Sequence, residues 1–162
     1  MIAFQDYVAI LNLYARYEHL GDAADPVVHS DCFTADGSLI AGGRLLASSR
    51  QQIANYRRES IAARQDRVRR HYITNIQLDS SDESVVHGQC YVQAWDYGAD
   101  GRVGLFACGT YEDIIKREEG TWRFLRRTLT IDYQSSPTSY SGPVISTGGS
   151  SGVSGPTSPP NP

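Results

Sequence analysis

The chain has 162 residues, 40% of them hydrophobic, and a formal net charge of −3. This length fits one domain and leaves too little chain for two. Apart from the arginine-rich stretch 67–70, no block of Lys or Arg stands clear of acidic residues, which argues against a nucleic-acid or membrane-surface protein.

The three cysteines, Cys32, Cys90 and Cys108, are widely spaced, and no C-x-x-C motif occurs. A zinc site or a disulfide framework is therefore not expected, and the cysteines are predicted to be small buried residues in a reducing compartment. The first ten residues lack the basic segment of a signal peptide, and no apolar run approaches the roughly 18 residues that span a bilayer. These features predict a cytoplasmic protein.

The first third of the chain shows helical patterns. Apolar residues at three- and four-residue steps predict an amphipathic helix over residues 4–19, which Gly21 is expected to end. Asp25 followed by Pro26 is typical of an N-cap and a first helical position, so a short second helix is expected through Phe33.

A third helix is predicted after a short extended stretch. Residues 36–37 are expected to form a turn and residues 38–41 a short strand. Residues 49–52 match a capping box, in which a serine hydroxyl and a glutamine amide satisfy backbone donors, and a helix of about four turns is expected to follow. Tyr56 lies near the inward stripe of that helix.

After Arg70 the hydrophobic period changes from helical to two. Strands are predicted over residues 71–79, 85–97, 102–117 and 121–133, joined by tight turns. Helices first and a meander of strands last predict an α+β architecture, with the domain covering residues 1–133. Residues 134–162 are rich in Ser, Gly, Pro and Thr, which favours a disordered tail; the alternative is that Tyr140, Val144 and Ile145 fold back as a lid over a pocket.

Tyr17, Asp22 and His71 are the candidate catalytic residues. An imidazole with a carboxylate on one nitrogen is held in one tautomer, and a tyrosine hydroxyl can stabilise an enolate. Such a trio supports removal of a proton next to a carbonyl, followed by loss of a β-hydroxyl. On an ideal helix Tyr17 and Asp22 are about 140° apart, so they converge only if the helix ends between them.

The strand that begins at His71 sets the expected faces of the sheet. Alternation places His71, Ile73, Asn75 and Gln77 on a partly polar face toward a pocket. Tyr72, Ile76 and Leu78 then form an apolar outer surface that could be a subunit contact, and a homodimer or homotrimer is expected.

Simpler interpretations of the same residues remain open. His71 could be a structural hydrogen-bonding residue, Asp22 a helix cap and Tyr17 part of the core, while His19 and His29 are expected to face solvent. Gln89 and Tyr91 share one face of the next strand and could bind polar groups of a substrate or form a hydrated surface. No nucleotide, phosphate, metalloprotease or serine-nucleophile motif occurs, so no cofactor and no metal are expected.

Five sequence motifs, in this order along the chain, resemble the SnoaL-like family of the NTF2-like superfamily. The similarity extends over residues 3–133 and looks closest to the branch with scytalone dehydratase and bile acid 7α-dehydratase. The motifs are RYEHLGDAAD at 16–25, CFTADG at 32–37, RHYITN at 70–75, GTYED at 109–113 and GTWRFLRR at 120–127.

The resemblance implies a cone in which three N-terminal helices pack on a curved mixed or antiparallel sheet and enclose a pocket. It implies metal-free catalysis, with the family's Tyr, Asp and His positions falling on Tyr17, Asp22 and His71. The family also has an arginine on the last strand, a position that Arg126 and Arg127 both fit. The expected substrate-binding residues are Gln89, Tyr91, Tyr56, Asn75 and Arg127.

One departure from the family pattern concerns the strand after His71. The dehydratases place a second His or an Asp there, whereas this chain has Gln89 or Tyr91. Protonation of a leaving hydroxyl would then come from His71 itself, from Tyr91 or from water.

The expected function is a cofactor-independent lyase, a dehydratase of a hydroxylated carbonyl small molecule such as a polyketide, steroid or terpenoid. The alternatives are an isomerase or cyclase of secondary metabolism and a non-catalytic ligand-binding or dimerisation module. Epoxide hydrolysis would need two carboxylates flanking a water, and Asp22 has no clear partner in the sequence.

Overall fold

The computed structural model describes residues 1–23, 25–64, 66–80, 82 and 84–135. The predicted tail lies outside these residues from position 136 onward, so neither disorder nor a lid over a pocket is tested. None of the described helices is both long and apolar enough to cross a membrane.

Three helices precede most of the sheet: α1 (Phe4–Ala23), α2 (Pro26–Ser30) and α3 (Arg50–Ala62). Both predicted caps are present, since the Asp25 side chain accepts hydrogen bonds at the start of α2 and the Ser49 hydroxyl accepts one from the N–H of Gln52. The reciprocal half of the capping box is absent, because the Gln52 amide oxygen instead accepts hydrogen bonds from Ser48.

The first helix is longer than predicted and continues through Gly21. The expectation that Gly21 ends the helix is therefore wrong. A Cβ at this position would collide with the guanidinium group of Arg57 on α3. The glycine allows two helices to approach closely rather than providing a left-handed cap.

The six strands of the sheet have the spatial order β2-β1-β6-β5-β4-β3, and all neighbours are antiparallel except the parallel pair β1 and β6. The predicted turn at 36–37 is wrong, because these residues lie inside β1 where its register with β6 shifts. Strand β2 was not predicted; Gly42 and Gly43, both with positive φ, form its hairpin turn. The strands are β1 (Phe33–Ala41), β2 (Arg44–Ala47), β3 (Val68–Ser80), β4 (Val85–Tyr97), β5 (Val103–Glu118) and β6 (Thr121–Gln134).

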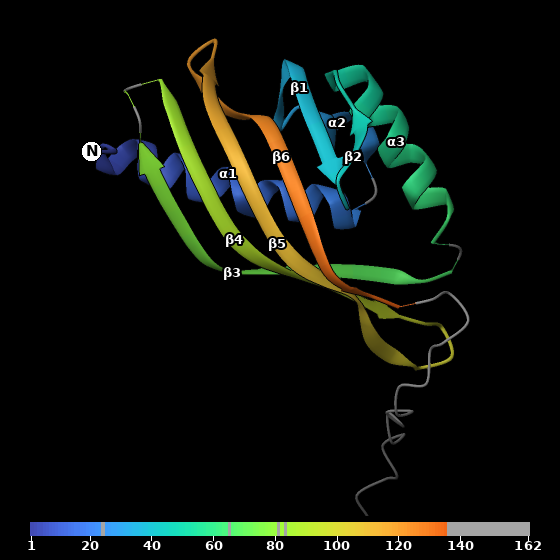
Figure 1. Cartoon of the computed structure of the whole chain (residues 1–162). Coiled ribbons are helices and arrows are strands. Elements are labelled where there is room, and N and C mark those ends of the chain that lie inside the picture. Colours follow the sequence, from blue (N-terminus) through green and yellow to red (C-terminus); the bar gives the residue numbers. More distant parts are fainter. Residues whose placement is uncertain (24, 65, 81, 83, 136–162) are drawn as a thin grey trace, which may run out of the picture.

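The sheet is strongly curved, and α1 runs across one of its faces while α2 and α3 lie beside β1 and β2 (Figure 1). The core fills the space between α1 and this inner face of the sheet. Its centre is formed by Ile10, Tyr14, Phe33, Ile115 and Phe124, none of which is exposed. Helices packed on one face of a mixed sheet confirm the predicted α+β class.

A β-bulge at Asn75 changes the inward face of β3. Asn75 has φ of 57°, and the register with β4 shifts between Thr74 and Gln77. Before the bulge His71 and Ile73 face α1; after it Ile76 and Leu78 pack against the core. Because one extra residue reverses the alternation, the expected shared face of His71, Asn75 and Gln77 is wrong.

The same bulge removes most of the expected apolar outer surface. Of the three residues expected on this surface, only Tyr72, which is half-exposed, lies on the outer face of the sheet.

Two of the three cysteines, Cys32 and Cys90, are buried as predicted, whereas Cys108 is half-buried. All three are free thiols.

Candidate active site

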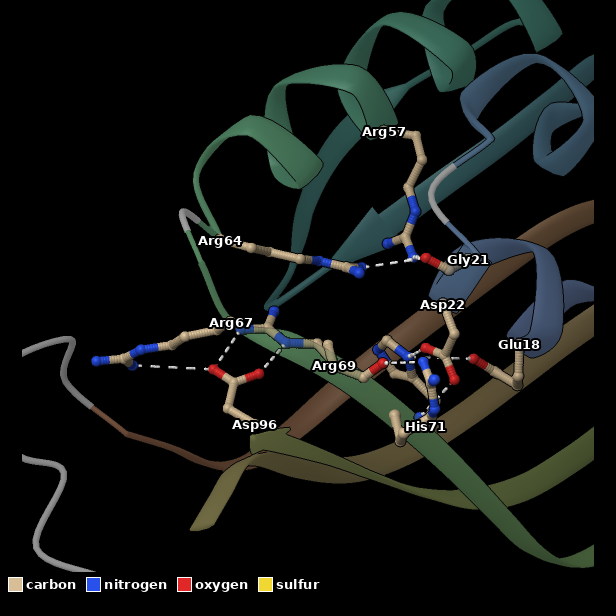
Figure 2. A network of polar contacts seen from close by, with 10 residues as sticks. Glu18, Gly21, Asp22, Arg57, Arg64, Arg67, Arg69, His71 and Asp96 are labelled. Atoms are coloured by element: carbon tan, nitrogen blue, oxygen red, sulfur yellow. Dashed lines mark hydrogen bonds and ion pairs between the residues drawn. The ribbon is translucent and has the colours of Figure 1, made fainter. Parts of the chain in front are cut away.

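His71 and Asp22 form a hydrogen-bonded pair between β3 and the last turn of α1 (Figure 2). The Nδ1 atom of His71 lies 2.7 Å from Oδ1 of Asp22, and the backbone N–H of His71 donates to Oδ2 at 3.1 Å. With a carboxylate on Nδ1, that nitrogen carries the proton and Nε2 keeps its lone pair. No described residue hydrogen-bonds Nε2, and the side chain is 13% exposed.

A second carboxyl group, that of Glu18, lies beside this pair. Because α1 continues through Asp22, the residue four positions earlier shares its helix face, whereas Tyr17 does not. Glu18 Oε2 is 3.9 Å from His71 Nδ1, and Oε1 is 3.5 Å from Nη1 of Arg127. Burial raises the pKa of Glu18, although electrostatic interactions with His71 and Arg127 lower it.

Behind Glu18, Arg127 forms a fully buried ion pair with Asp113. Its Nε and Nη2 donate to the two carboxylate oxygens at 2.9 Å each, and the Tyr14 hydroxyl donates to the same carboxylate at 2.6 Å. The guanidinium carbon lies 4.0 Å from the ring centres of both Tyr111 and Phe124. Although burial lowers it, the Asp113 carboxylate raises the pKa of Arg127 well above its usual range.

Tyr17 occupies the aromatic layer above Arg127 rather than the side of α1 that carries Asp22. Its ring centre lies 4.3 Å from the guanidinium carbon of Arg127 and 4.4 Å from the ring of His29. No described residue hydrogen-bonds its hydroxyl. Burial raises the pKa of Tyr17 to about 12, so the hydroxyl keeps its proton at neutral pH.

Comparison with known families identifies the chain. A family model described as the SnoaL-like domain matches residues 3–128, which is most of the chain. The chain belongs to the SnoaL-like family. No curated protein sequence matches it at a significant level.

Solved structures share the fold of this SnoaL-like chain at low sequence identity, which supports the fold alone. Aln2 from a Streptomyces species has 20% identity and a TM-score of 0.74, over 82% of this chain and 94% of that one. A provisionally assigned scytalone dehydratase from Novosphingobium aromaticivorans has 24% identity and a TM-score of 0.69, over 80% and 85%. ActVI-ORFA from Streptomyces coelicolor has 20% identity and a TM-score of 0.70, over 78% and 97%.

The SnoaL-like resemblance did not decide between Arg126 and Arg127 as the family's arginine on the last strand, and in the structure the two side chains lie on opposite faces of the sheet. Arg127 faces inward, and its Nε and Nη2 donors are taken by Asp113. Arg126 faces the opposite side of the sheet and lines a cavity of about 430 Å³ there. The expectation that Arg127 binds a substrate directly does not fit this buried pairing.

The other expected substrate-binding residues do not gather at His71. Gln89 lines the outer-face cavity, and Tyr91 on the same strand face is 55% exposed, so both lie on the far side of the sheet from α1. Asn75 is the exposed bulge residue, whereas Tyr56 packs against the core from α3. The expected contact of Gln89 and Tyr91 with a substrate at His71 is therefore wrong, because the inner face of β4 carries their sequence neighbours.

Two site features were missed at the level of sequence. Glu18 could have been found from its four-residue spacing to Asp22. His29, which was expected to face solvent, is 2% exposed and packs on Tyr17.

Among the described residues, no group of three or more His, Cys, Asp or Glu side chains is arranged to hold a metal ion.

Proposed function

We propose that the protein is a cofactor-independent lyase in which His71 removes a proton next to a substrate carbonyl. The observation that supports this is the 2.7 Å contact between His71 Nδ1 and Asp22 Oδ1, with Nε2 left without a described partner. The carboxylate fixes the tautomer and stabilises the imidazolium that forms when Nε2 accepts a proton. The second Asp22 oxygen is engaged by the backbone of His71, which fixes the carboxylate as well.

The elimination can be balanced with His71 alone as the proton carrier. Nε2 takes the proton from the carbon next to the carbonyl, and the electron pair forms the enolate. The imidazolium then returns the proton to the β-hydroxyl, which leaves as water while the double bond forms. This route needs no titratable residue at position 89 or 91, which agrees with the outward orientation of both side chains.

Glu18 and Tyr17 have supporting roles in this proposal. Glu18 is a second carboxyl group near His71 Nδ1, so it acts from behind the ring and positions the histidine rather than contacting the substrate. Tyr17 keeps its proton because burial raises the pKa of its hydroxyl, and a protonated hydroxyl can donate to an enolate oxygen. Both carboxyl groups face the same nitrogen, an arrangement that does not favour epoxide hydrolysis.

The test is proton exchange and elimination on a set of β-hydroxy ketones in D₂O, followed by NMR and mass spectrometry. The wild-type protein should exchange the proton next to the carbonyl of at least one compound and release water from it. His71→Ala should lower both rates by at least about 100-fold, as expected for loss of general acid–base catalysis. His87→Ala, on the outer face, is the matched control and should keep full activity. Full activity of His71→Ala would rule the mechanism out.

Isomerisation or cyclisation would begin with the same proton transfer, and product mass distinguishes them because neither reaction loses water. A non-catalytic ligand-binding domain is favoured by one observation: Tyr17, expected to be catalytic, and Arg127, expected to bind a substrate, are only 7% and 0% exposed. Binding without exchange of any substrate proton would support that second function.

The expected homodimer or homotrimer remains a prediction that sedimentation at several concentrations would test.

A further inference from the structure

Two arginines from the α3 side converge on one backbone carbonyl beside the His71–Asp22 pair. Arg57 and Arg64 each donate an Nη2 hydrogen bond to the carbonyl oxygen of Gly21, at 3.3 Å for Arg64 (Figure 2). Gly21 directly precedes Asp22, so the two guanidinium groups lie next to the residue that holds His71. Neither arginine has a carboxylate within ion-pair distance among the described residues. The carboxylates of Asp22 and Asp96 for Arg64, and of Glu18 for Arg57, interact with the two guanidinium groups only from beyond ion-pair distance.

The buried donors of these arginines are incompletely used. Arg64 is 7% exposed, and the buried Nε atoms of both arginines have no hydrogen-bond partner among the described residues. Burial lowers the pKa of Arg64 to about 10, and the nearby charge of Arg57 acts in the same direction. Arg69 and Arg127, by contrast, are each bound bidentately by an aspartate. Unpaired buried donors are unfavourable unless another group hydrogen-bonds to them.

A third unpartnered polar group lies at the same place. A Cβ added to Gly21 would contact both the Arg57 guanidinium group and the ring of His29, so these two side chains meet over Gly21. His29 is 2% exposed, and no residue in the described part of the chain hydrogen-bonds to either of its ring nitrogens. Burial, followed by the charges of Arg57 and Arg127, lowers the pKa of His29 to about 2, so the ring is a neutral donor and acceptor.

We infer that Arg57 and Arg64 bind a carboxylate of the substrate beside the His71–Asp22 pair. Guanidinium groups bind carboxylates through parallel charge-assisted hydrogen bonds, and a negative charge would relieve the repulsion between the two arginines. The substrate would therefore carry a carboxylate in addition to the carbonyl next to its reacting carbon. The position of the substrate's reacting carbon at His71 rests on the proposed function. The binding of a carboxylate by Arg57 and Arg64 does not.

The other explanation is that the two arginines only cap the end of α1, where cations are favourable. Capping predicts a loss of thermal stability on mutation but no preference for a charged ligand. A pair of probes that differ only in charge separates the two explanations, and 1-naphthaleneacetate and 1-naphthaleneacetamide form such a pair. Their affinities can be measured by titration calorimetry without any turnover.

The wild-type protein should bind the acid at least about tenfold more tightly than the amide. Arg57→Met and Arg64→Met should each bring the two affinities together, with the affinity for the amide unchanged. Arg57 is half-buried, so its variant is expected to fold even if the variant of the buried Arg64 does not. In histidine NMR spectra of the wild-type protein, the acid should shift the signals of His29 and His71 but not that of His87.

Two matched controls are Arg58→Met, exposed on the same helix, and Arg126→Met, in the outer-face cavity. Both should keep the preference for the acid. The inference is overturned if the wild-type protein binds the two probes equally or binds neither, if Arg57→Met keeps the preference, or if Arg126→Met loses it. His71→Ala should retain the preference; if the preference persists but no elimination is found with any acid, the proposed function alone has failed.

Discussion

Arg127 and Asp113 lie directly opposite each other on β6 and β5, and their side chains form a bidentate ion pair with no exposure to solvent. The pair connects the core of the domain to the site, because the free Nη1 of Arg127 is 3.5 Å from Glu18, which in turn lies beside His71. The same residues therefore influence stability and the position of the proposed base.

Removing one partner of this pair should destabilise the fold strongly. Arg127→Met leaves Asp113 buried with only the Tyr14 hydroxyl as a partner, and we expect a loss of about 3–5 kcal/mol in the free energy of unfolding. Urea unfolding followed by circular dichroism measures this loss. Arg127→Met with Asp113→Leu should recover part of it, since the Asp113 carboxylate is then removed as well and only the Glu18 contact is lost.

The control for that prediction is the exposed pair of Asp100 and Arg102, whose side chains are 60% and 52% exposed. Asp100→Asn should cost less than about 1 kcal/mol, because solvent screens the interaction. Similar losses in Asp100→Asn and Arg127→Met would contradict the assigned importance of the buried pair.

Gly88 on β4 should not tolerate a side chain. A Cβ there would overlap the Tyr14 hydroxyl, which donates to Asp113, so Gly88→Ala must displace this ring from its hydrogen bond. We expect a loss of about 1–3 kcal/mol, as is usual for overpacking. Gly88→Ala combined with Tyr14→Phe should cost less than the sum of the two single changes, and additive losses in thermal unfolding would refute the steric explanation.

His29 should make the fold less stable in acid. Its pKa is lowered from 6.5 to about 2 in the folded state, so between these values the unfolded chain binds more protons. Stability therefore rises with pH in this window and is lost as the pH falls below 6.5, by at most about 1.4 kcal/mol per pH unit from this residue. Unfolding of His29→Leu between pH 7 and pH 4, an interval of about three units, should show a shallower dependence than wild type.

The exposed His19 provides the control for the pH experiment, because His19→Leu should leave the slope unchanged. Glu18 acts in the opposite sense, since its pKa is raised and its protonation stabilises the folded state as the pH falls. Comparing variants with wild type removes this contribution. Equal slopes in His29→Leu and wild type would show that the ring is not neutral and buried as described.

Asp22 and Glu18 should affect turnover to different degrees. Asp22→Asn places an amide on His71 Nδ1 and removes the charge that stabilises the imidazolium, so we expect kcat to fall by about 100-fold or more. Glu18→Gln, at 3.9 Å from the same nitrogen, should lower kcat less and leave KM nearly unchanged. Steady-state kinetics on the compound identified by proton exchange measures both, and a larger effect for Glu18→Gln would reverse the assignment.

The later strands and the helix starts could be predicted from the sequence because their signals are local. Buried and exposed residues alternate along β4 as the period-two pattern implies. The caps at Asp25 and Ser49 depend on the capping residue and the next few backbone groups. The pairing of Asp22 with His71 needed the family resemblance, since 49 residues separate them.

What could not be predicted depends on contacts between distant segments. Gly21 looks like a helix stop in sequence, but its role is set by the Arg57 side chain from α3. The bulge at Asn75 reverses the face of every residue after it, and only pairing with β4 reveals it. Arg126 and Arg127 could not be distinguished, because an extra residue in β6, Leu125, shifts the register opposite Ile114 and Ile115 and reverses the alternation of faces.

The parallel pairing of β1 with β6 also bears on how the protein forms. Phe33 lies opposite Phe124, so the first strand of the described residues hydrogen-bonds to the last one. Closing so long a loop is entropically costly and typically slow. Until residues 121–134 are available to pair, the edges of β1 and β5 stay open, which makes the chain most prone to chaperone contact or aggregation before β6 is in place.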